Sequence, residues 1–242
     1  MPESDAFGIG MRILVKMRSG SHLYGTSTPQ SDVDLKGVHL PPANDILLQR
    51  VLPAIKSRSK VTPDLRNTAG DTDSESFSLQ KFLQDLLAGQ PVALSMLFTP
   101  DSFIFETTDV WDEIRGHKRR WLHRSIKPMA NFCRHWANAS KIPPKNDTQT
   151  DWKGMAHAVR MCHEAEELLT HHVITYPRPE AELLVRIRSG VISQKDLAEM
   201  IGEGVGQMEK SMLNSTLPES PDALLADTVV AAQYRLEITN SS

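Results

Sequence analysis

The region between residues 11 and 40 constrains the fold of this chain more than any other part of it. An apolar run, Ile13-Leu14-Val15, leads into the pair Gly20-Ser21, and Asp32-x-Asp34 opens a second apolar segment. Short apolar runs bounded by Gly, Ser and Pro are typical of buried strands. The pattern therefore predicts strands over 11–17 and 32–40, separated by a short helical turn at 22–25 and a polar loop.

The two aspartates point to a metal–phosphate site. Side chains alternate along a strand, so Asp32 and Asp34 lie on one face with their carboxylates roughly 6–7 Å apart. Like charges at that distance are costly unless a cation lies between them, and Mg²⁺ favours such oxygen ligands while leaving positions open for phosphate. A Gly-Ser turn lets the backbone approach a triphosphate closely, and Ser21 can donate a hydrogen bond to it. The plainer interpretation is an acidic surface turn.

The order of these motifs resembles the signature of the DNA polymerase β-like nucleotidyltransferase superfamily. The fuller string, Gly-Ser-x-Leu-Tyr-Gly-Thr followed by Ser-Asp-Val-Asp-Leu-Lys-Gly-Val, is similar to a branch of predicted nucleotidyltransferases found beside RNA ligases in bacteria and phages. Lys-x-x-x-His-x-x-Arg, from residue 153, and Tyr-x-Arg-Pro, from residue 176, resemble later blocks of that family.

A third carboxylate is implied by this resemblance, because polymerase β-like sites usually take one from a neighbouring strand. A strand expected over 71–77 carries Asp71, Asp73 and Glu75 on one face, before a helix that Ser78 caps and Gly89 ends. We expect Glu75 or Asp73 to be the third ligand, and the sequence does not rank them. The alternative is that all three are exposed carboxylates at a strand edge.

The remainder of the chain separates into an irregular segment and a helical half. Residues 43–70 are polar and interrupted by Pro and Gly, which indicates a loop, either variable or closing over a substrate. Helical patterns follow at 112–139, 151–171, 179–189, 193–213 and 221–237. The predicted class is α+β: a small nucleotidyltransferase α/β catalytic domain with a mixed sheet over 1–108, then an α-helical domain over 109–242.

Two groups of basic residues in the helical half are candidates for binding phosphate. Lys153, His157 and Arg160 lie on one helical stripe, which suits a triphosphate; the plainer interpretation is a solvated face with an Arg160–Glu164 pair. The most basic stretch would place Arg120, Arg124 and Lys127 on one helix face, as a contact for a nucleic-acid backbone or as a solvated surface.

Composition excludes several other classes. A net charge of −3 gives no general attraction to nucleic acid, so a polyanion needs a local patch. Two cysteines offer no disulfide framework, and neither zinc-ligand spacing nor a Walker-type or dinucleotide glycine motif occurs. No apolar run approaches the length of a membrane span, and the first residues lack the features of a signal peptide. We expect a cytoplasmic chain of bacterial or phage origin, without a membrane partner.

The expected function is metal-dependent nucleotidyl transfer from an NTP to an acceptor hydroxyl, foremost an RNA end. Alternatives are AMP transfer to a protein, as in toxin–antitoxin systems, transfer to a small molecule, and a non-catalytic nucleotide- or RNA-binding module. Nothing in the sequence selects the nucleotide, the acceptor or the oligomeric state. The resemblance implies two Mg²⁺ (or Mn²⁺) ions held by Asp32, Asp34 and Glu75 or Asp73, and an NTP held by Gly20, Ser21, Lys153, His157 and Arg160.

Overall fold

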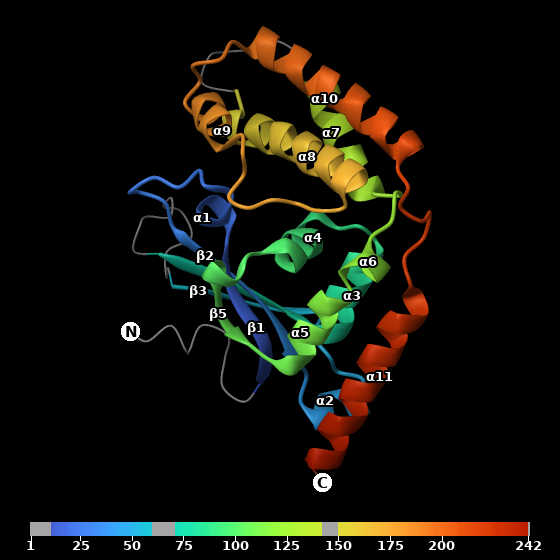
Figure 1. Ribbon diagram of the computed structural model, residues 1–242. Helices are drawn as coiled ribbons and strands as arrows, with labels where there is room; N and C mark the ends of the chain where they lie inside the picture. Colours follow the sequence, from blue (N-terminus) through green and yellow to red (C-terminus); the bar gives the residue numbers. More distant parts are fainter. Residues whose placement is uncertain (1–10, 60–70, 142–149, 242) are drawn as a thin grey trace. The chain divides into compact units, whose positions relative to one another are not determined.

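A computed structural model describes residues 11–59, 71–141 and 150–241, and its class is α+β, as predicted (Figure 1). Its contacts divide the chain into two compact units that interleave along the sequence. The first is drawn from Met1–Leu87, Thr99–Trp121 and Asp222–Ser242, and the second from Ala88–Phe98 and Leu122–Pro221. The single domain boundary expected after residue 108 stays a prediction.

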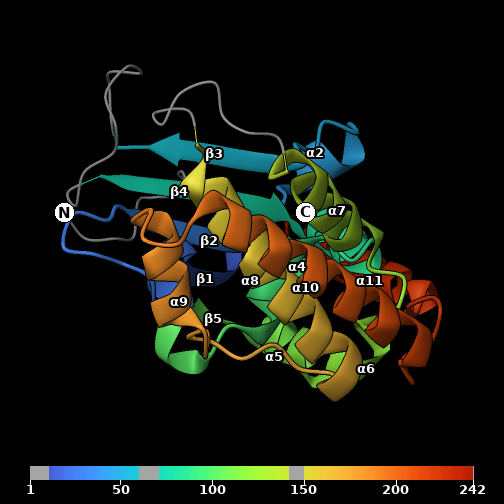
Figure 2. The same ribbon diagram turned by 90° about the horizontal axis from the view of Figure 1, so that it is seen from above.

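In its described residues, the first unit contains a five-stranded mixed sheet in the order β3-β4-β2-β1-β5 (Figure 2). Strands β2 and β4 are parallel, and the other pairs are antiparallel. The strands predicted over 11–17, 32–40 and 71–77 are confirmed. The bounds are β1 Arg12–Ser19, β2 Val33–Leu40, β3 Ala54–Arg58, β4 Thr72–Ser78 and β5 Ile104–Thr107.

The prediction that residues 43–70 are irregular is wrong for part of that segment. Helix α2 (Ala43–Leu47) and strand β3 both lie within it, and residues 60–70 are outside the described residues. Among the residues that the structure describes, β3 pairs with β4 and forms the edge of the sheet. Its polar composition gives little local indication of a strand. The strand forms because pairing with β4 stabilises it, and this pairing cannot be read from the local sequence.

Helices of the first unit pack on this sheet and on one another. In α3, Leu79, Phe82, Leu83 and Leu86 are buried at helical spacing, and the Ser78 hydroxyl accepts from the Lys81 N–H at 3.3 Å, as a predicted N-cap should. The Phe82 and Trp111 rings lie 5.2 Å apart in the core. The bounds are α1 Gly20–Tyr24, α3 Leu79–Leu87, the 3₁₀ turn Asp101–Phe103, α5 Asp109–Gly116, α6 Lys118–Trp121 and α11 Ala223–Asn240.

The second unit is helical, and α7, α8 and α10 pack together in it (Figures 1 and 2). The helices predicted over 151–171, 179–189, 193–213 and 221–237 are confirmed, the last of them in the first unit. None of the helices in the described ranges is long and apolar enough to cross a bilayer. The bounds are α4 Pro91–Phe98, α7 Lys127–Ala139, α8 Trp152–His171, α9 Ala181–Arg188 and α10 Gln194–Asn214.

A single helix over 112–139 is wrong, because the chain forms α5, α6 and α7 there. Pro128 lies in the first turn of α7, where its missing N–H leaves no intrahelical bond unmade. The same residue in the middle of a long helix would remove a hydrogen bond and clash with the preceding turn. The helical periodicity of the sequence continues across this region, but the backbone does not form one continuous helix.

Candidate functional site

Asp34 and Asp73 lie side by side at the start of the parallel strands β2 and β4, and Asp32 directly precedes β2. The register pairs Asp34 with Asp73 and, one residue earlier, Val33 with Thr72. The Val33 N–H donates to the Asp71 carbonyl at 3.0 Å. Register partners project from the same face of a sheet, so Asp34 and Asp73 share one face. The fold therefore places Asp34 and Asp73 on a common face, from strands that are far apart in sequence.

Gly20 lies directly against the carboxylate of Asp34. Strand β1 ends at Ser19, which is in register with Asp34, and the chain then turns into α1 with Gly20 at φ +63°. A Cβ on Gly20 would lie 1.9 Å from Asp34 Oδ2, so no other residue fits this backbone without moving the carboxylate. The antiparallel β1–β2 pairing thus brings together the two motifs that the sequence singled out.

The next residue, Ser21, has a buried hydroxyl that could bind a ligand. Its Oγ is buried and has no hydrogen-bond partner among the described residues. Buried polar atoms are nearly always satisfied, so such an atom directly after Gly20 indicates a place for a ligand oxygen.

Glu75 is held by two lysines, in contrast to its expected role. Its Oε2 accepts from Lys36 Nζ at 2.6 Å, and its Oε1 lies 3.0 Å from Lys56 Nζ. Partial burial opposes ionisation, but the hydrogen bonds and charges of the two lysines together keep the pKa of Glu75 below its usual value. The cation near Asp73 is farther away, because Asp73 Oδ1 lies 4.0 Å from Arg58 Nε.

The aspartates of β2 and β4 offer the kind of ligand that a hard cation prefers. They supply oxygen donors alone, on one face and beside a glycine that leaves room for phosphate. Within the described residues, however, no three His, Cys, Asp or Glu side chains form a group that could hold a metal ion. The predicted metal ligands Asp32, Asp34 and Glu75 therefore stay a prediction.

The α8 stripe differs in exposure from one residue to the next. Lys153 is exposed, whereas His157 packs against the Phe132 ring with 4.8 Å between ring centroids. Burial, with the charges of Arg160 and Lys153, lowers the pKa of His157 to about 3, so this residue is neutral at pH 7. The stripe therefore presents one exposed cation and not three.

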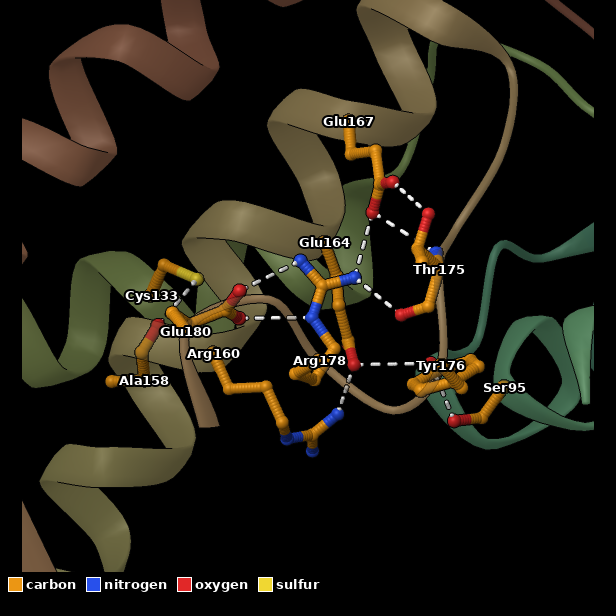
Figure 3. A network of polar contacts seen from close by, with 10 residues as sticks. All are labelled: Ser95, Cys133, Ala158, Arg160, Glu164, Glu167, Thr175, Tyr176, Arg178 and Glu180. Carbon is orange, nitrogen blue, oxygen red and sulfur yellow. Dashed lines mark hydrogen bonds and ion pairs between the residues drawn. The ribbon is translucent and has the colours of Figure 1, made fainter. Parts of the chain in front are cut away.

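Arg160 belongs to a buried polar network (Figure 3). It donates to Glu164 Oε1, which also accepts from the Tyr176 hydroxyl at 3.0 Å. The Tyr176 and Ser95 hydroxyls are 2.8 Å apart. The Arg160–Glu164 pair of the plainer interpretation exists, but it is buried and not solvated.

A second buried arginine, Arg178, lies beside this network, with its Cζ 6.0 Å from the centroid of the Tyr176 ring. The Arg178 side chain is only 2% exposed, and it donates to Glu167 Oε2 at 2.7 Å and to Glu180 Oε1 at 2.9 Å (Figure 3). Burial opposes its charge, yet the bonds to Glu180 and Glu167 raise the pKa of Arg178. Tyr176 and Arg178 come from the Tyr-x-Arg-Pro segment, so the resemblance marked residues whose contacts are internal to the second unit.

Arg120, Arg124 and Lys127 do not share a helix face, because the helix that would have aligned them is interrupted. Arg120 lies on α6 and donates from Nε to Asp222 at 3.0 Å. Arg124 lies between α6 and α7, with its guanidinium 3.6 Å from Glu219. Lys127 is the exposed first residue of α7. Their contact with nucleic acid stays a prediction.

Two cations near the aspartates were missed at the level of sequence. Lys56 and Arg58 lie on β3, in register with Glu75 and Asp73. Their alternation, Lys-x-Arg, was the available signal, but the surrounding polar segment indicated a loop.

Comparison with known proteins agrees with the motifs. Residues 4–224 match the model of RlaP, described as the RNA repair pathway DNA polymerase beta family. An uncharacterized 38.9 kDa protein from the nrdC-mobD intergenic region of Enterobacteria phage T4 is 38% identical over 130 residues. That match covers 53% of this chain and only 38% of the phage protein.

A solved nucleotidyltransferase-like protein from Exiguobacterium sibiricum 255-15 aligns over 96% of this chain and 75% of its own. The TM-score is 0.32 at 9% identity, which is too low to support any structural inference. The family match is different in kind, since it spans most of the sequence and includes the Gly-Ser and Asp-x-Asp motifs. The chain belongs to the RNA repair pathway DNA polymerase beta family, and the resemblance to polymerase β-like nucleotidyltransferases is confirmed.

Proposed function

We propose that this protein transfers a nucleoside monophosphate from an NTP to an acceptor hydroxyl, foremost at an RNA end, with release of pyrophosphate. The observation that carries the proposal is the register of Asp34 with Asp73 in adjacent parallel strands. This register brings Asp73 beside Asp34, the residue that Gly20 approaches.

Asp32, Asp34 and Asp73 would hold the divalent cations, Mg²⁺ or Mn²⁺. When bound, these ions supply the charge that lowers the pKa of the acceptor hydroxyl and stabilises the leaving pyrophosphate. We place Asp73 ahead of Glu75, because both Glu75 oxygens are already engaged by lysines. Glu75 then has a different role, which is to hold the ammonium groups of Lys36 and Lys56 beside the aspartates.

Gly20 and Ser21 would hold the triphosphate. The backbone at Gly20 is bare and lies against Asp34, so a phosphate can come close to the carboxylate and the cation that it holds. The Ser21 hydroxyl has no competing partner among the described residues and is free to donate to a phosphate oxygen.

On α8 we propose a narrower role than the sequence suggested. Lys153 is the exposed cation available to a nucleotide phosphate, and Arg160 instead orders the helix through Glu164. His157, neutral at pH 7, contributes packing and no charge.

The test is a label-transfer assay with each α-³²P-NTP, Mg²⁺ or Mn²⁺, and total cellular RNA and protein. Wild type should label RNA, the Asp32→Ala/Asp34→Ala variant should not, and Asp227→Asn, an exposed carboxylate on α11, should behave as wild type. Label in a protein band would assign a protein hydroxyl as acceptor. NTP binding without any transfer would contradict catalysis and favour the binding module.

A further inference from the structure

The face that carries the aspartates also carries a pattern of cations at one edge. Strand β3 pairs Arg58 with Asp73 and Lys56 with Glu75. Adding β2, two rows cross three strands on one face: Asp34–Asp73–Arg58 and Lys36–Glu75–Lys56. Each row ends on β3, which is the edge of the sheet, with a cation.

These two end cations are exposed, while the carboxylates they neighbour are not. The Lys56 and Arg58 side chains are 69% and 74% exposed, against 18% for Glu75 and 29% for Asp73. Glu75 already has Lys36 at 2.6 Å, so Lys56 adds positive charge beyond what this carboxylate needs. Arg58 approaches Asp73 only to 4.0 Å, which leaves most of its guanidinium available to a ligand.

The order of the strands separates this edge from the nucleotide cradle. In the first row, Ser19 on β1 pairs with Asp34 on the side away from Asp73, and Gly20 and Ser21 follow Ser19 directly. The aspartates therefore lie between Gly20-Ser21 on one flank and Arg58 and Lys56 on the other. A triphosphate on the first flank leaves the second flank for the other substrate.

We propose that Lys56 and Arg58 bind the sugar–phosphate backbone of a single-stranded RNA acceptor, which lies along β3 with its terminal hydroxyl directed toward Asp34 and Asp73. Arginine binds phosphate oxygens in a bidentate manner, and lysine binds them as a point charge. The two side chains are spaced by two strand residues, about 6.6 Å, which matches consecutive phosphates of an extended strand. This inference rests on the proposed function for the direction of the acceptor.

Direct RNA binding tests the inference without requiring turnover. A fluorescent single-stranded RNA is titrated with the full chain at several salt concentrations, and anisotropy gives the affinity. The Lys56→Gln/Arg58→Gln variant should bind about tenfold more weakly at 0.1 M salt. Its log–log salt slope should be smaller by about 1.4, since each single-strand phosphate contact contributes about 0.7.

Three controls make the result specific. Arg186→Gln/Lys195→Gln removes two exposed cations from α9 and α10 and should leave affinity and slope unchanged. Lys56→Arg/Arg58→Lys should retain RNA binding. NTP affinity of the Lys56→Gln/Arg58→Gln variant should equal that of wild type, because the nucleotide cradle lies on the other flank.

The outcomes also separate this inference from the proposed function. An unchanged salt slope, with only a lowered melting temperature, would reduce Lys56 and Arg58 to cross-strand ion pairs and overturn the inference, even if the wild type labels RNA. In the label-transfer assay, label in a protein band that is equal for wild type and Lys56→Gln/Arg58→Gln would also overturn the inference. A reduced slope in a chain that transfers no label would support the RNA-binding edge and contradict the reaction alone.

Discussion

Asp34 on β2 and Asp73 on β4 are register partners in neighbouring parallel strands, so their side chains project from the same face of the sheet. Glu75 lies one row further along, where Lys36 and Lys56 engage both of its oxygens. The backbone pairing thus distinguishes two acidic residues that the sequence left equivalent.

Replacing these two residues separately should give unequal effects. Asp73→Asn removes a proposed cation ligand, and we expect initial rates of label transfer to fall by about 10²–10³-fold, as for other lost charge-stabilising groups. Glu75→Gln should reduce the rate less than tenfold, because it disturbs only the placement of Lys36 and Lys56. The reverse ranking would assign Glu75 as the third ligand.

Gly20→Ala should inactivate the site through sterics. The added Cβ would lie 1.9 Å from Asp34 Oδ2, and φ of +63° is unfavourable for alanine. We expect at least a 100-fold loss of transfer and a loss of about 1 kcal/mol or more in the free energy of unfolding. Gly116→Ala is the matched control, since a Cβ there meets nothing within 4 Å; equal effects of both variants would contradict the steric explanation.

Alanine replacement of Arg160 should affect mainly stability, and alanine replacement of Lys153 mainly NTP affinity. Arg160→Ala leaves the buried Glu164 carboxylate without its ion pair, and we expect the free energy of unfolding to fall by about 3–5 kcal/mol. Lys153→Ala should leave chemical denaturation unchanged and weaken NTP binding by a few-fold, measured by calorimetry. A stable Arg160→Ala variant with lost NTP affinity would instead return Arg160 to the nucleotide site.

Two glycines of α10, Gly202 and Gly204, should respond in opposite directions to replacement by alanine. A Cβ on Gly204 would lie 2.9 Å from the Cys162 Cβ, whereas a Cβ on Gly202 meets nothing within 4 Å. Gly204→Ala should lower the free energy of unfolding by about 1–3 kcal/mol through overpacking. Gly202→Ala should raise it by about 0.5–1 kcal/mol, because alanine favours the helix. Urea unfolding of both variants measures the difference. A higher free energy of unfolding for Gly204→Ala as well would show that the α8–α10 contact relaxes to accept the added Cβ.

Acid should destabilise the fold through two histidines, His39, which is buried, and His157, which is half-buried. Burial lowers the pKa of His39 to about 4, and burial with nearby positive charge lowers that of His157 to about 3. An unfolded histidine titrates near about 6.5, so between that pH and the folded pKa only the unfolded state takes up the proton. Stability is therefore complete above about pH 6.5 and falls with decreasing pH, by up to about 1.4 kcal/mol per pH unit for each histidine.

Urea unfolding between pH 5 and 7 measures this dependence. His39→Gln should flatten the pH profile, and His163→Gln, at an exposed position of α8, should leave it unchanged. An identical slope in wild type and His39→Gln would exclude His39 as a source of the acid sensitivity.

Local patterns determined much of this protein. The apolar runs beside Gly20-Ser21 and Asp32-x-Asp34 predicted β1 and β2, and helical periodicity predicted α3 and the helices from α8 onward. These predictions succeed because alternation and amphipathic spacing act over a few residues. The motifs that carry the family resemblance are local in the same sense, and the family match spans them.

Only the tertiary structure decided the rest. Three features depend on segments that are not neighbours in sequence: the register that sets Asp73 beside Asp34, the edge strand that carries Lys56 and Arg58, and the burial of Arg160. Periodicity also continued through 112–139, where Pro128 begins a new helix. Strand pairing and burial are properties of the assembled chain, because a residue's face, neighbour and exposure are set by which distant segment packs against it.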